Sequence, residues 1–562
     1  MKGLFGQISG GNITMDNESL LPVKDATGRY QMVLSGEFYD GNTPQSVLEA
    51  YISLGTKALD TLDGVFAMAI WDSETKRLLL ARDRFGCKML YYHIAKDGII
   101  FSSDIPAILA TMSAKPLPDE ESIFDYLVFN RTDQTERTFF RDIKKVQHGH
   151  YLLYDVLTLH TEIVKWYDLT TAVEKRKTSL ANRKLNKTQT DYFMTIFRRA
   201  IDKRIAGDKA WGLCLSGGLD SSAIVSIVIN DMHKPEVHTF SSVYGQQYKA
   251  DESKFIHEFD NIVPHMHYVH PNGQDLFNDM MDVIRCQVEP TPTTSPYALY
   301  SVLKEAKPHV SVVLDGQGSD EALAGYEYIP GLYYKSLLTH FRWCTWLREN
   351  VRYLKLHRSP RSLRYTAFFL LPKRWRTKVR VAQRGYINTT FVAQHQHSVI
   401  ADKLYGATTM TEMLVNHFEY KLEHLLKWGE RNVMHFDMIG RSPFMDTELV
   451  EYAIALDDGA KVHNGWTKFI LREAMKGIMP EKVRTRVDKK GFAVPQDEWF
   501  REPQFEQFVR ELLSSDSFAK RGYIIPSKAL ALYERHLKGE INISKDIWKW
   551  INLELWFRMY ID

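Results

Sequence analysis

Residues 211–222, with the sequence WGLCLSGGLDSS, constrain the fold more than any other part of the chain. An apolar run leads directly into Ser216, Gly217 and Gly218, and a second apolar run, AIVSIVIN, follows. This order predicts a strand, a glycine turn and a helix, and the amides at such a helix N-terminus bind phosphate groups. It is not a Walker loop, because GxxxxGK is absent. Asp220 would repel a bare phosphate and therefore predicts a Mg²⁺ ion shared with the phosphates.

The runs around this loop indicate an α/β domain. WGLCLS, VHTFSSV and SVVLDG alternate with helical stretches, the pattern of a parallel sheet with crossover helices, and from about residue 330 the chain reads as mostly helical. Residues 1–165 differ, since they contain short apolar runs separated by turn residues and one helix expected over 44–54. They predict an antiparallel α+β domain. Residues 170–190 are polar and read as a linker that leads into a helix over about 188–206.

Composition narrows the class of protein. A length of 562 residues suggests two to four domains, and 25 % charged and 44 % hydrophobic residues are ordinary for a globular chain. A net charge of +3 argues against a dedicated nucleic-acid binder. The four scattered cysteines form no metal or disulfide pattern, and the sequence shows neither a signal peptide nor a membrane-spanning run. We expect a cytoplasmic multi-domain protein.

Several further motifs carry a family resemblance. The loop SGGLDSS resembles the pyrophosphate loop of N-type ATP pyrophosphatases, which cleave ATP between the α and β phosphates to adenylate a substrate. The chain resembles the asparagine synthetase superfamily in VVLDGQGSDEALAGY (312–326), RSPFMD (441–446), TKFILREA (467–474) and KKGFAVP (489–495). In the N-terminal region LDGVFAMAIWD (62–72) and ARDRFGCKMLYY (81–92) are similar to family motifs. The resemblance runs from residue 3 to about residue 500.

This resemblance implies a domain organisation. Residues 1–168 are expected to form an Ntn-hydrolase-like domain of the class II glutamine amidotransferase type, and residues 169–187 a linker. Residues 188–562 are expected to form an α/β parallel-sheet ATP-pyrophosphatase domain of the adenine nucleotide alpha-hydrolase type, with many helices.

The resemblance also implies the site residues. ATP phosphates would be bound by Ser216, Gly217, Gly218, Leu219, Asp220 and Ser221. Adenine would lie against Cys214, Ser242, Asp315 and Gly316, and Mg²⁺ would be held by Asp220 and Asp320. Lys489 matches a lysine that stabilises charge on the α-phosphate, a role that suits a fixed cation. Gln317 and Arg441 complete the predicted catalytic set beside the acceptor; a solvated basic turn is the alternative for Lys489.

The N-terminal domain departs from the family at three places. Lys2 stands where glutamine-dependent members have a nucleophilic cysteine after the initiator methionine, and an ammonium cannot replace a thiolate. Ser35 replaces the asparagine of the oxyanion hole, and Gly41-Asn42-Thr43-Pro44 replaces the glutamine-binding SDTE. We therefore expect a retained fold without glutaminase activity.

Departures near the acceptor cast doubt on aspartate as the substrate. Gln317 replaces a glutamate, and an amide cannot accept a proton at neutral pH. Ile439 replaces a second glutamate and Val433 a serine, although Arg441 remains. The ATP-binding motifs are not affected.

Three functions remain open at this point. The first is an ATP-dependent carbon–nitrogen ligase that forms an acyl-AMP and couples it to an amine, resembling lasso-peptide cyclases and asparagine synthetase B-like amide ligases. Such an enzyme would close a macrolactam in a precursor peptide, with a leader-processing protease as a partner. The second is an asparagine synthetase that takes free or partner-supplied ammonia. The third is a non-catalytic scaffold, which the intact SGGLDSS, Asp320 and Lys489 disfavour.

Residues 335–384 form a strongly basic segment. They contain 14 Lys and Arg residues and one acid, Glu349, together with several aromatic residues. Solvated basic faces of amphipathic helices are one interpretation. The other is a contact surface for an acidic substrate or a peripheral membrane, with aromatic and arginine anchors. Nucleic acid is disfavoured, because no reader motif is present.

Overall fold

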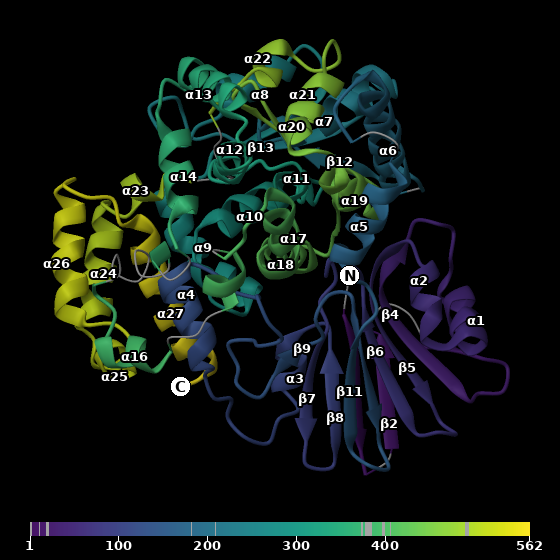
Figure 1. Cartoon of the computed structure of the whole chain (residues 1–562). Helices are drawn as coiled ribbons and strands as arrows, with labels where there is room; N and C mark the ends of the chain where they lie inside the picture. Colours follow the sequence, from purple (N-terminus) through teal and green to yellow (C-terminus); the bar gives the residue numbers. More distant parts are fainter. Residues whose placement is uncertain are drawn as a thin grey trace.

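The computed structural model describes residues 3–10, 12–17, 22–180, 183–207, 209–372, 375–376, 385–395, 399–404, 406–488 and 494–562. A β-rich N-terminal domain lies beside a larger, mainly helical C-terminal domain (Figure 1). In the described part of the chain, no helix combines the length and the apolar character needed to cross a membrane.

Two antiparallel sheets form the centre of the N-terminal domain. The first contains, in spatial order, β2 (Asn12–Asn17), β1 (Leu4–Ser9), β8 (Gly98–Ser102), β7 (Tyr91–Ala95) and β9 (Lys144–Lys145). The second contains β11 (His160–Lys165), β10 (His150–Asp155), β6 (Arg77–Arg82), β5 (Gly64–Asp72), β4 (Tyr30–Phe38) and β3 (Val23–Lys24). Most of these strands coincide with the apolar runs read from the sequence.

Helices cover both outer faces of this sandwich. The sheets meet through a shared core that includes Leu4, Phe101 and Trp71. The outer face of the second sheet packs against α1 (Pro44–Leu54) and α2 (Ala58–Thr61). The first sheet is followed by α3 (Ile105–Leu109) and α4 (Glu120–Phe129), which share a core with β7 and β8. The predicted α+β architecture is confirmed as four layers.

Helix α1 has the bounds that the sequence predicts. Thr43 accepts a hydrogen bond from the amide of Ser46, and the Ser46 side chain reaches back to the Thr43 amide. This capping box, with Pro44 in the first turn, fixes the start of the helix.

A five-stranded parallel sheet forms the base of the C-terminal domain. Its spatial order is β14 (His265–Val269), β13 (His238–Ser242), β12 (Trp211–Cys214), β15 (Val312–Leu314) and β16 (Ile439–Arg441). The runs WGLCLS, VHTFSSV and SVVLDG are β12, β13 and β15, so the predicted parallel sheet is confirmed. The outer strands β14 and β16 were not among the predicted strands.

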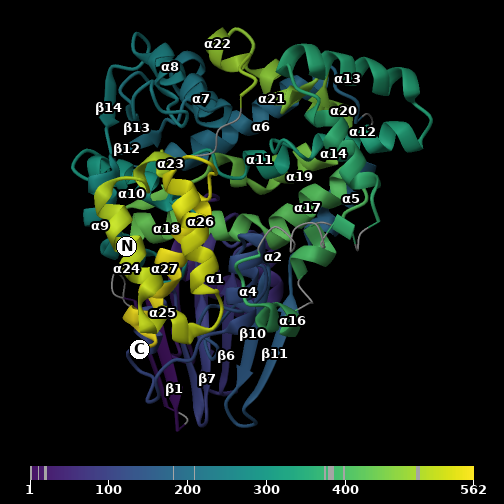
Figure 2. The ribbon, with the colours of Figure 1, turned by 90° about the vertical axis from the view of Figure 1, so that its left-hand side faces the viewer.

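Helices surround this sheet and continue to the end of the chain (Figure 2). Helix α6 (Lys187–Ile205) precedes the first strand of this sheet, β12. Between β12 and β15 lie α7 (Leu219–Ser226), α8 (Ser253–Ile256), α9 (Gly273–Gln287) and α10 (Ser295–Ala306), and α11 (Ser319–Ala322) follows β15. The following helices are α12 (Pro330–Thr339), α13 (Trp343–His357), α14 (Arg361–Leu370), α16 (Thr389–Gln394), α17 (Met410–Tyr420), α18 (Leu422–His435) and α19 (Thr447–Ala455). The last are α20 (Asp458–Lys461), α21 (Phe469–Ala474), α22 (Glu481–Arg484), α23 (Gln496–Trp499), α24 (Pro503–Ser514), α25 (Asp516–Arg521), α26 (Pro526–Leu537) and α27 (Ser544–Tyr560). A short β17 (Val462–His463) and β18 (Trp466–Thr467) pair separately.

The two domains are in close contact along several elements. Residues 169–187, predicted as a linker, contain α5 (Leu169–Ser179), which packs against α19 through the buried Val173. At the other side α4 lies beside α27 (Figure 1). There the Lys549 ammonium donates to the carbonyl of Leu127 at 2.7 Å. The covalent connection is therefore only one of several links between the domains.

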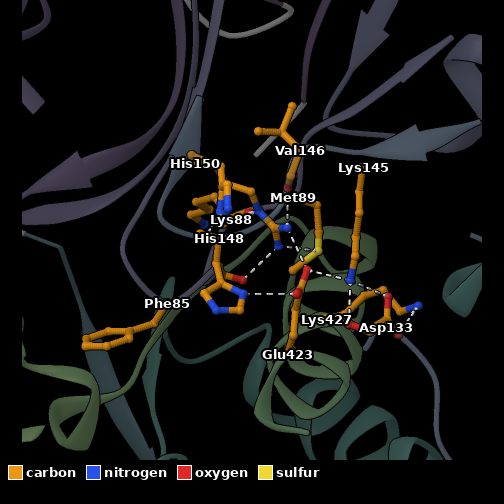
Figure 3. Close-up of polar contacts among 12 residues, drawn as sticks. Phe85, Lys88, Met89, Asp133, Lys145, Val146, His148, His150, Glu423 and Lys427 are labelled. Atoms are coloured by element: carbon orange, nitrogen blue, oxygen red, sulfur yellow. Dashed lines mark hydrogen bonds and ion pairs between the residues drawn. The ribbon is translucent and has the colours of Figure 1, made fainter. Parts of the chain in front are cut away.

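Helix α18 contributes the most charged part of this interface. Glu423 is buried and accepts hydrogen bonds from Arg82 at 2.6 Å and from the Nδ1 side of His148 at 3.2 Å. The Lys145 ammonium lies 2.9 Å from the same carboxylate. Figure 3 shows Lys145 and His148 pointing from the N-terminal domain toward Glu423. Burial alone would raise the pKa of Glu423, but Arg82 and Lys145 hold it well below its ordinary value.

One turn further along α18, a buried cation lies between two carboxylates. The Lys427 ammonium lies 2.6 Å from Asp133 and 2.9 Å from Glu289, and all three side chains are buried. Burial would lower the pKa of Lys427, but the two carboxylates raise it. Each buried charge on α18 thus has an opposite charge beside it, which is required for a stable interface of this kind.

Candidate functional site

The predicted glycine loop joins β12 to α7. Gly217 has a φ of +70°, in the left-handed region that favours glycine. A Cβ at this position would lie 3.1 Å from side-chain atoms of Phe255 and Ile256, so the turn also depends on a close approach. The first turn of α7 lines a cavity through Gly218 and Leu219. A helix N-terminus open to a cavity is suited to bind an anion.

Hydroxyl groups and an arginine brace the loop. The Oγ atoms of Ser216 and Ser221 are 3.1 Å apart, and the amide of Gly218 donates to the Ser216 Oγ at 3.3 Å. The Arg486 guanidinium donates to the carbonyl of Gly217 at 2.6 Å. The loop is therefore held in shape by the chain itself.

Two carboxylates converge beneath the loop. Asp220 lies in the first turn of α7, and Asp320 lies in α11. The Lys468 ammonium is 2.5 and 2.6 Å from the two oxygens of Asp220 and 2.6 Å from Oδ1 of Asp320. Lys468 has a φ of +53°, an uncommon conformation for a lysine that places its side chain between the two carboxylates.

The carboxylates fit the predicted metal. Carboxylate oxygens are the ligands that Mg²⁺ prefers, and two of them converge here on one point of positive charge. Burial lowers the pKa of Lys468, and Asp220 opposes this effect. Asp220 and Asp320 bring carboxylate oxygens from two separate helices to one place beside the glycine loop, and this donor set fits a divalent cation.

The second motif, 312–326, brings the remaining predicted groups to the loop. A Cβ on Gly316 would lie 2.8 Å from the Cβ of Asp220. Only glycine therefore allows the loop after β15 to pack this closely against α7. Ser319 donates to Asp220 at 2.7 Å. The two motifs, about a hundred residues apart, therefore form one site.

A cavity of about 350 Å³ contains most of the predicted residues. Those that line it are Cys214, Ser216, Gly218, Leu219, Asp220, Ser221, Asp315, Gly316, Gln317 and Asp320. Gly217 shapes the loop without lining the cavity, and Ser242 lies at the end of the adjacent β13 outside the lining. Lys489 lies outside the described residues, so its predicted role stays a prediction.

Three cations of this cavity were not among the predicted site residues. They are Lys468, Arg472 and Arg486. Burial lowers the pKa of Arg472 to about 10. The signal was present for the first two, because TKFILREA (467–474) was recognised as a family motif without a role for its basic residues. Arg486, which also pairs with Glu252 at 2.7 Å, lies outside the family motifs, so no signal in the sequence indicated it.

The inner end of the cavity is less polar. Burial raises the pKa of the Cys214 thiol and of Asp315. Ser442 donates to Asp315 at 2.6 Å, and the amide of Gln317 donates to the same carboxylate at 3.1 Å. The Cys214 thiol and the hydrogen-bonded Asp315 lie beside apolar groups such as Leu299, and this surface suits a flat heterocycle such as adenine.

Arg441 lies outside the main cavity. Its Nε and one terminal nitrogen donate to both oxygens of Glu37 in the N-terminal domain, at 2.6 and 2.7 Å. It lines a smaller interdomain cavity of about 40 Å³, whose walls also include Gln317. Gln317 thus lies between the two cavities, whereas the arginine is engaged in joining the domains. Its catalytic role stays a prediction.

The fold and the site define a nucleotide-binding α/β domain joined to an amidotransferase-type sandwich. The family model for asparagine synthase matches residues 193–558, and that for a glutamine amidotransferase domain matches residues 42–167. The chain belongs to the asparagine synthase family, and it is an asparagine synthetase-like, ATP-dependent ligase by family. The amidotransferase match begins after Lys2 and Ser35, two of the three departures noted above.

Curated relatives match over nearly the whole chain. Asparagine synthetase [glutamine-hydrolyzing] 1 of Bacillus subtilis is 27 % identical over 95 % of this chain and 84 % of its own. A putative asparagine synthetase [glutamine-hydrolyzing] of Mycobacterium tuberculosis is 23 % identical over 96 % of this chain and 86 % of its own. An amidase, chry2, of Gibberella zeae is 22 % identical over 90 % of this chain and 82 % of its own.

Proposed function

We propose that the protein adenylates a carboxylate with ATP and couples the activated acyl group to an amine of the same substrate. The observation that carries the proposal is the arrangement around Lys468, where Asp220 and Asp320 converge beneath a glycine loop. This arrangement supports binding of a magnesium–triphosphate group. Lys2 supports the second half of the proposal, because it leaves the chain without the N-terminal cysteine nucleophile.

In this proposal the glycine loop and the two carboxylates have separate tasks. The amides of Gly218 and Leu219 and the hydroxyls of Ser216 and Ser221 bind phosphate oxygens. Asp220 and Asp320 would hold Mg²⁺, which neutralises phosphate charge when bound.

Basic residues complete the binding of the triphosphate. Arg472 and Arg486 add positive charge to the cavity wall, and Lys468 can shift from the carboxylates to the phosphates. We assign Lys489 to the α-phosphate, where a fixed cation stabilises charge that develops as the acid attacks.

The proposed reaction needs positioning more than a protein nucleophile. A carboxylate oxygen bonds to the α-phosphorus of ATP, and the bond from that phosphorus to the bridging oxygen breaks, releasing pyrophosphate. The amine nitrogen then bonds to the acyl carbon, AMP leaves with its oxygen, and the amine proton passes to solvent or to AMP. Gln317 can orient the acceptor through its amide but cannot remove that proton.

The N-terminal domain supports an amine from the substrate rather than from glutamine. The interdomain cavity of about 40 Å³ has room for only a few water molecules. Arg441, Lys88 and Glu430 line it, and they are engaged in ion pairs, Arg441 with Glu37 and Lys88 with Glu430. A peptide whose carboxylate and amine react with each other would give a macrolactam, as in lasso-peptide cyclases, with a leader-processing protease as a partner.

A second candidate is an asparagine synthetase that uses ammonia from solution or from a partner. The names of the bacterial relatives favour it, since they are asparagine synthetases. Gln317 and Ile439 count against it, because both replace acidic residues expected near the acceptor.

Pyrophosphate release by the purified full chain separates these functions. We expect ATP- and Mg²⁺-dependent release of AMP and pyrophosphate with a peptide that bears both a carboxylate and an amine, and no glutamate from glutamine. Release driven by aspartate with ammonium would replace the first candidate by the second. Glutamate formation would overturn the inactive amidotransferase domain, and absence of any ATP binding would overturn both candidates.

We also place the protein in a reducing compartment such as the cytoplasm. Cys87, Cys214, Cys286 and Cys344 are all free thiols. Free and partly buried cysteines without disulfides are typical of proteins that stay in such a compartment.

A further inference from the structure

Helices α13 and α14 bury faces that are largely polar and expose large apolar side chains. Helix α13 buries Glu349 and Asn350 together with Tyr353, and α14 buries Ser362 and Thr366 together with Phe369. Large apolar side chains point to solvent instead, among them Phe341, which is 78 % exposed. The exposed large apolar residues of this region are Phe341, Trp343, Leu347, Val351, Leu354, Leu363, Leu370, Leu371 and Trp375. A surface helix in water normally shows the reverse pattern.

The exposed residues of α13 form one continuous stripe. Trp343, Leu347, Val351 and Leu354 follow each other at intervals of four, four and three residues, so they share one face of the helix. In Figures 1 and 2 α13 lies at the end of the molecule away from the N-terminal strands. The stripe is therefore open to a large flat partner.

Positive charge accompanies the stripe. The exposed basic residues on and between the two helices are Arg342, Arg348, Arg352, Lys355, Arg358, Arg361 and Arg364. Arg361 pairs with Glu327 at 3.0 Å. The acid within α13, Glu349, is buried and accepts from the amide of Gly465 at 3.1 Å. Its charge therefore faces inward, and the outer surface is basic and apolar together.

We propose that the surface formed by α13 and α14 binds a negatively charged lipid membrane. An apolar stripe bounded by Arg and Lys is the arrangement that lies in the interface of a bilayer, with apolar residues among the acyl chains. Each basic residue near an anionic membrane surface adds electrostatic attraction to it. The aromatic residues Phe341 and Trp343, at the N-terminal end of α13, suit the headgroup level. The inference is independent of the ligase activity.

Vesicle sedimentation of the full chain tests this surface. We expect binding to vesicles of phosphatidylcholine with phosphatidylglycerol, weak binding to phosphatidylcholine alone, and a decline with added salt. The double change Leu347→Glu with Val351→Glu should lower binding more than tenfold, as should Arg348→Glu with Arg352→Glu. Leu157→Glu, at an exposed site in the N-terminal domain, is the matched control.

The same variants distinguish a membrane from other binding partners of the α13 and α14 surface. Equal binding to neutral vesicles, or binding that the stripe variants leave unchanged, would overturn the proposal. A dimer in lipid-free buffer that the stripe variants dissociate would instead assign the surface to a second copy of the chain. Circular dichroism and the unfolding midpoint of each variant confirm that loss of binding is not loss of fold.

A second, independent observation concerns three histidines at the opposite end of the parallel sheet from the glycine loop. His238 begins β13, His267 lies in β14, and His309 precedes β15. One ring nitrogen from each lies within 4.8 Å of the others, and Nδ1 of His238 is 2.9 Å from Nε2 of His267. Glu305 approaches both His309, at 3.7 Å, and His267, at 4.0 Å.

The geometry points to a site for a transition-metal dication such as Zn²⁺. Imidazole is a preferred ligand of Zn²⁺, Cu²⁺ and Ni²⁺, and a carboxylate or water can complete the set. Nitrogens bound to one zinc ion at about 2.0–2.1 Å lie roughly 3.3 Å apart, so the exposed His309 would rotate inward. Nδ1 of His238 and Nε2 of His267, now 2.9 Å apart, would need to separate only slightly.

Metal analysis of the tag-free full chain tests the histidine site. After incubation with zinc sulfate and dialysis, we expect one zinc ion per chain and an upward shift of the unfolding midpoint. His267→Ala and His309→Ala should each lose both effects. His160→Ala, at an exposed histidine of β11, should retain them. Cobalt should give the visible absorption of a tetrahedral site in the unmodified chain; zinc retained equally by all variants, or by none, would overturn the site.

Discussion

The cavity cluster around Lys468 and the interface cluster around Glu423 both bury charged side chains, but in opposite proportions. In the cavity two carboxylates surround one lysine, and about 350 Å³ of space lies beside them. At the interface one carboxylate faces Arg82, Lys145 and His148, and the nearby cavity at Lys427 measures about 10 Å³. A closed cluster, in which the charged groups pair with one another and leave little space, holds the domains together, whereas an open cluster with free space beside its carboxylates can accept a ligand.

Removing the central charge of the closed cluster should have the largest effect. Glu423→Gln leaves Arg82 and Lys145 buried without their common anion. Loss of one partner from a buried pair costs about 3–5 kcal/mol. Urea unfolding of the variant should therefore show a free energy of unfolding lower by about this amount.

The neighbouring Glu419 provides the control. It also contacts His148 but is more exposed and pairs with the surface residue Lys165. Glu419→Gln should cost about 1 kcal/mol or less. Similar losses of stability for both variants would mean that the ion pairs of Glu423 are no stronger than those of the more exposed Glu419.

In the open cluster the same kind of change should affect activity rather than stability. Asp220→Asn removes one carboxylate, but Asp320 still pairs with Lys468. The free energy of unfolding should change by about 1 kcal/mol or less. Pyrophosphate release should fall by about 10²–10³-fold, the typical cost of losing a group that stabilises transition-state charge.

Asp488→Asn is the matched change at the mouth of the cavity. Asp488 lines the same space but is partly exposed and lies beside Arg486 rather than beneath the loop. Its pyrophosphate release should remain close to that of the unmodified chain. Equal losses for the two variants would indicate a general electrostatic effect instead of a metal-binding role for Asp220.

The contrast also explains what could be predicted from the sequence. Local patterns predicted α1, β12 and the glycine loop, because turn residues, apolar runs and caps act over a few residues. The family resemblance of the motifs then predicted that Asp220 and Asp320 belong to the same metal site. The role of Lys468 was missed although its motif was recognised, since its left-handed backbone and its position between two carboxylates arise only from the tertiary fold.

The closed cluster was less predictable still. Arg82 and Glu423 are 341 residues apart, and although Arg82 stands in the motif ARDRFGCKMLYY, nothing in the sequence indicates which residue it pairs with. Their pairing depends on how α18 packs against the sandwich. The exposed apolar stripe on α13 was predicted only as a basic aromatic segment, because the sequence does not say which face a helix buries.

The smallest expected effect is a change in how the stability of the closed cluster depends on pH, through His148. Burial alone would lower the pKa of His148, but hydrogen bonds to Glu419 and Glu423 raise it to about 9. The unfolded value is about 6.5, so the protonated histidine stabilises the fold fully below about pH 6.5. This contribution, about 1–3 kcal/mol, is lost as the pH rises from about 6.5 to 9. Unfolding of His148→Gln at both ends of this range should show a smaller decline in stability than the unmodified chain.

His150→Gln gives a control of opposite sign. Burial lowers the pKa of His150, so its contribution to stability grows as the pH rises through the ordinary histidine range. Removing it should steepen the decline that His148 produces, whereas removing His148 should flatten it. If both variants changed the pH profile in the same direction, His148 would not be protonated against Glu423, and the closed cluster would lack one of the ion pairs assigned to it.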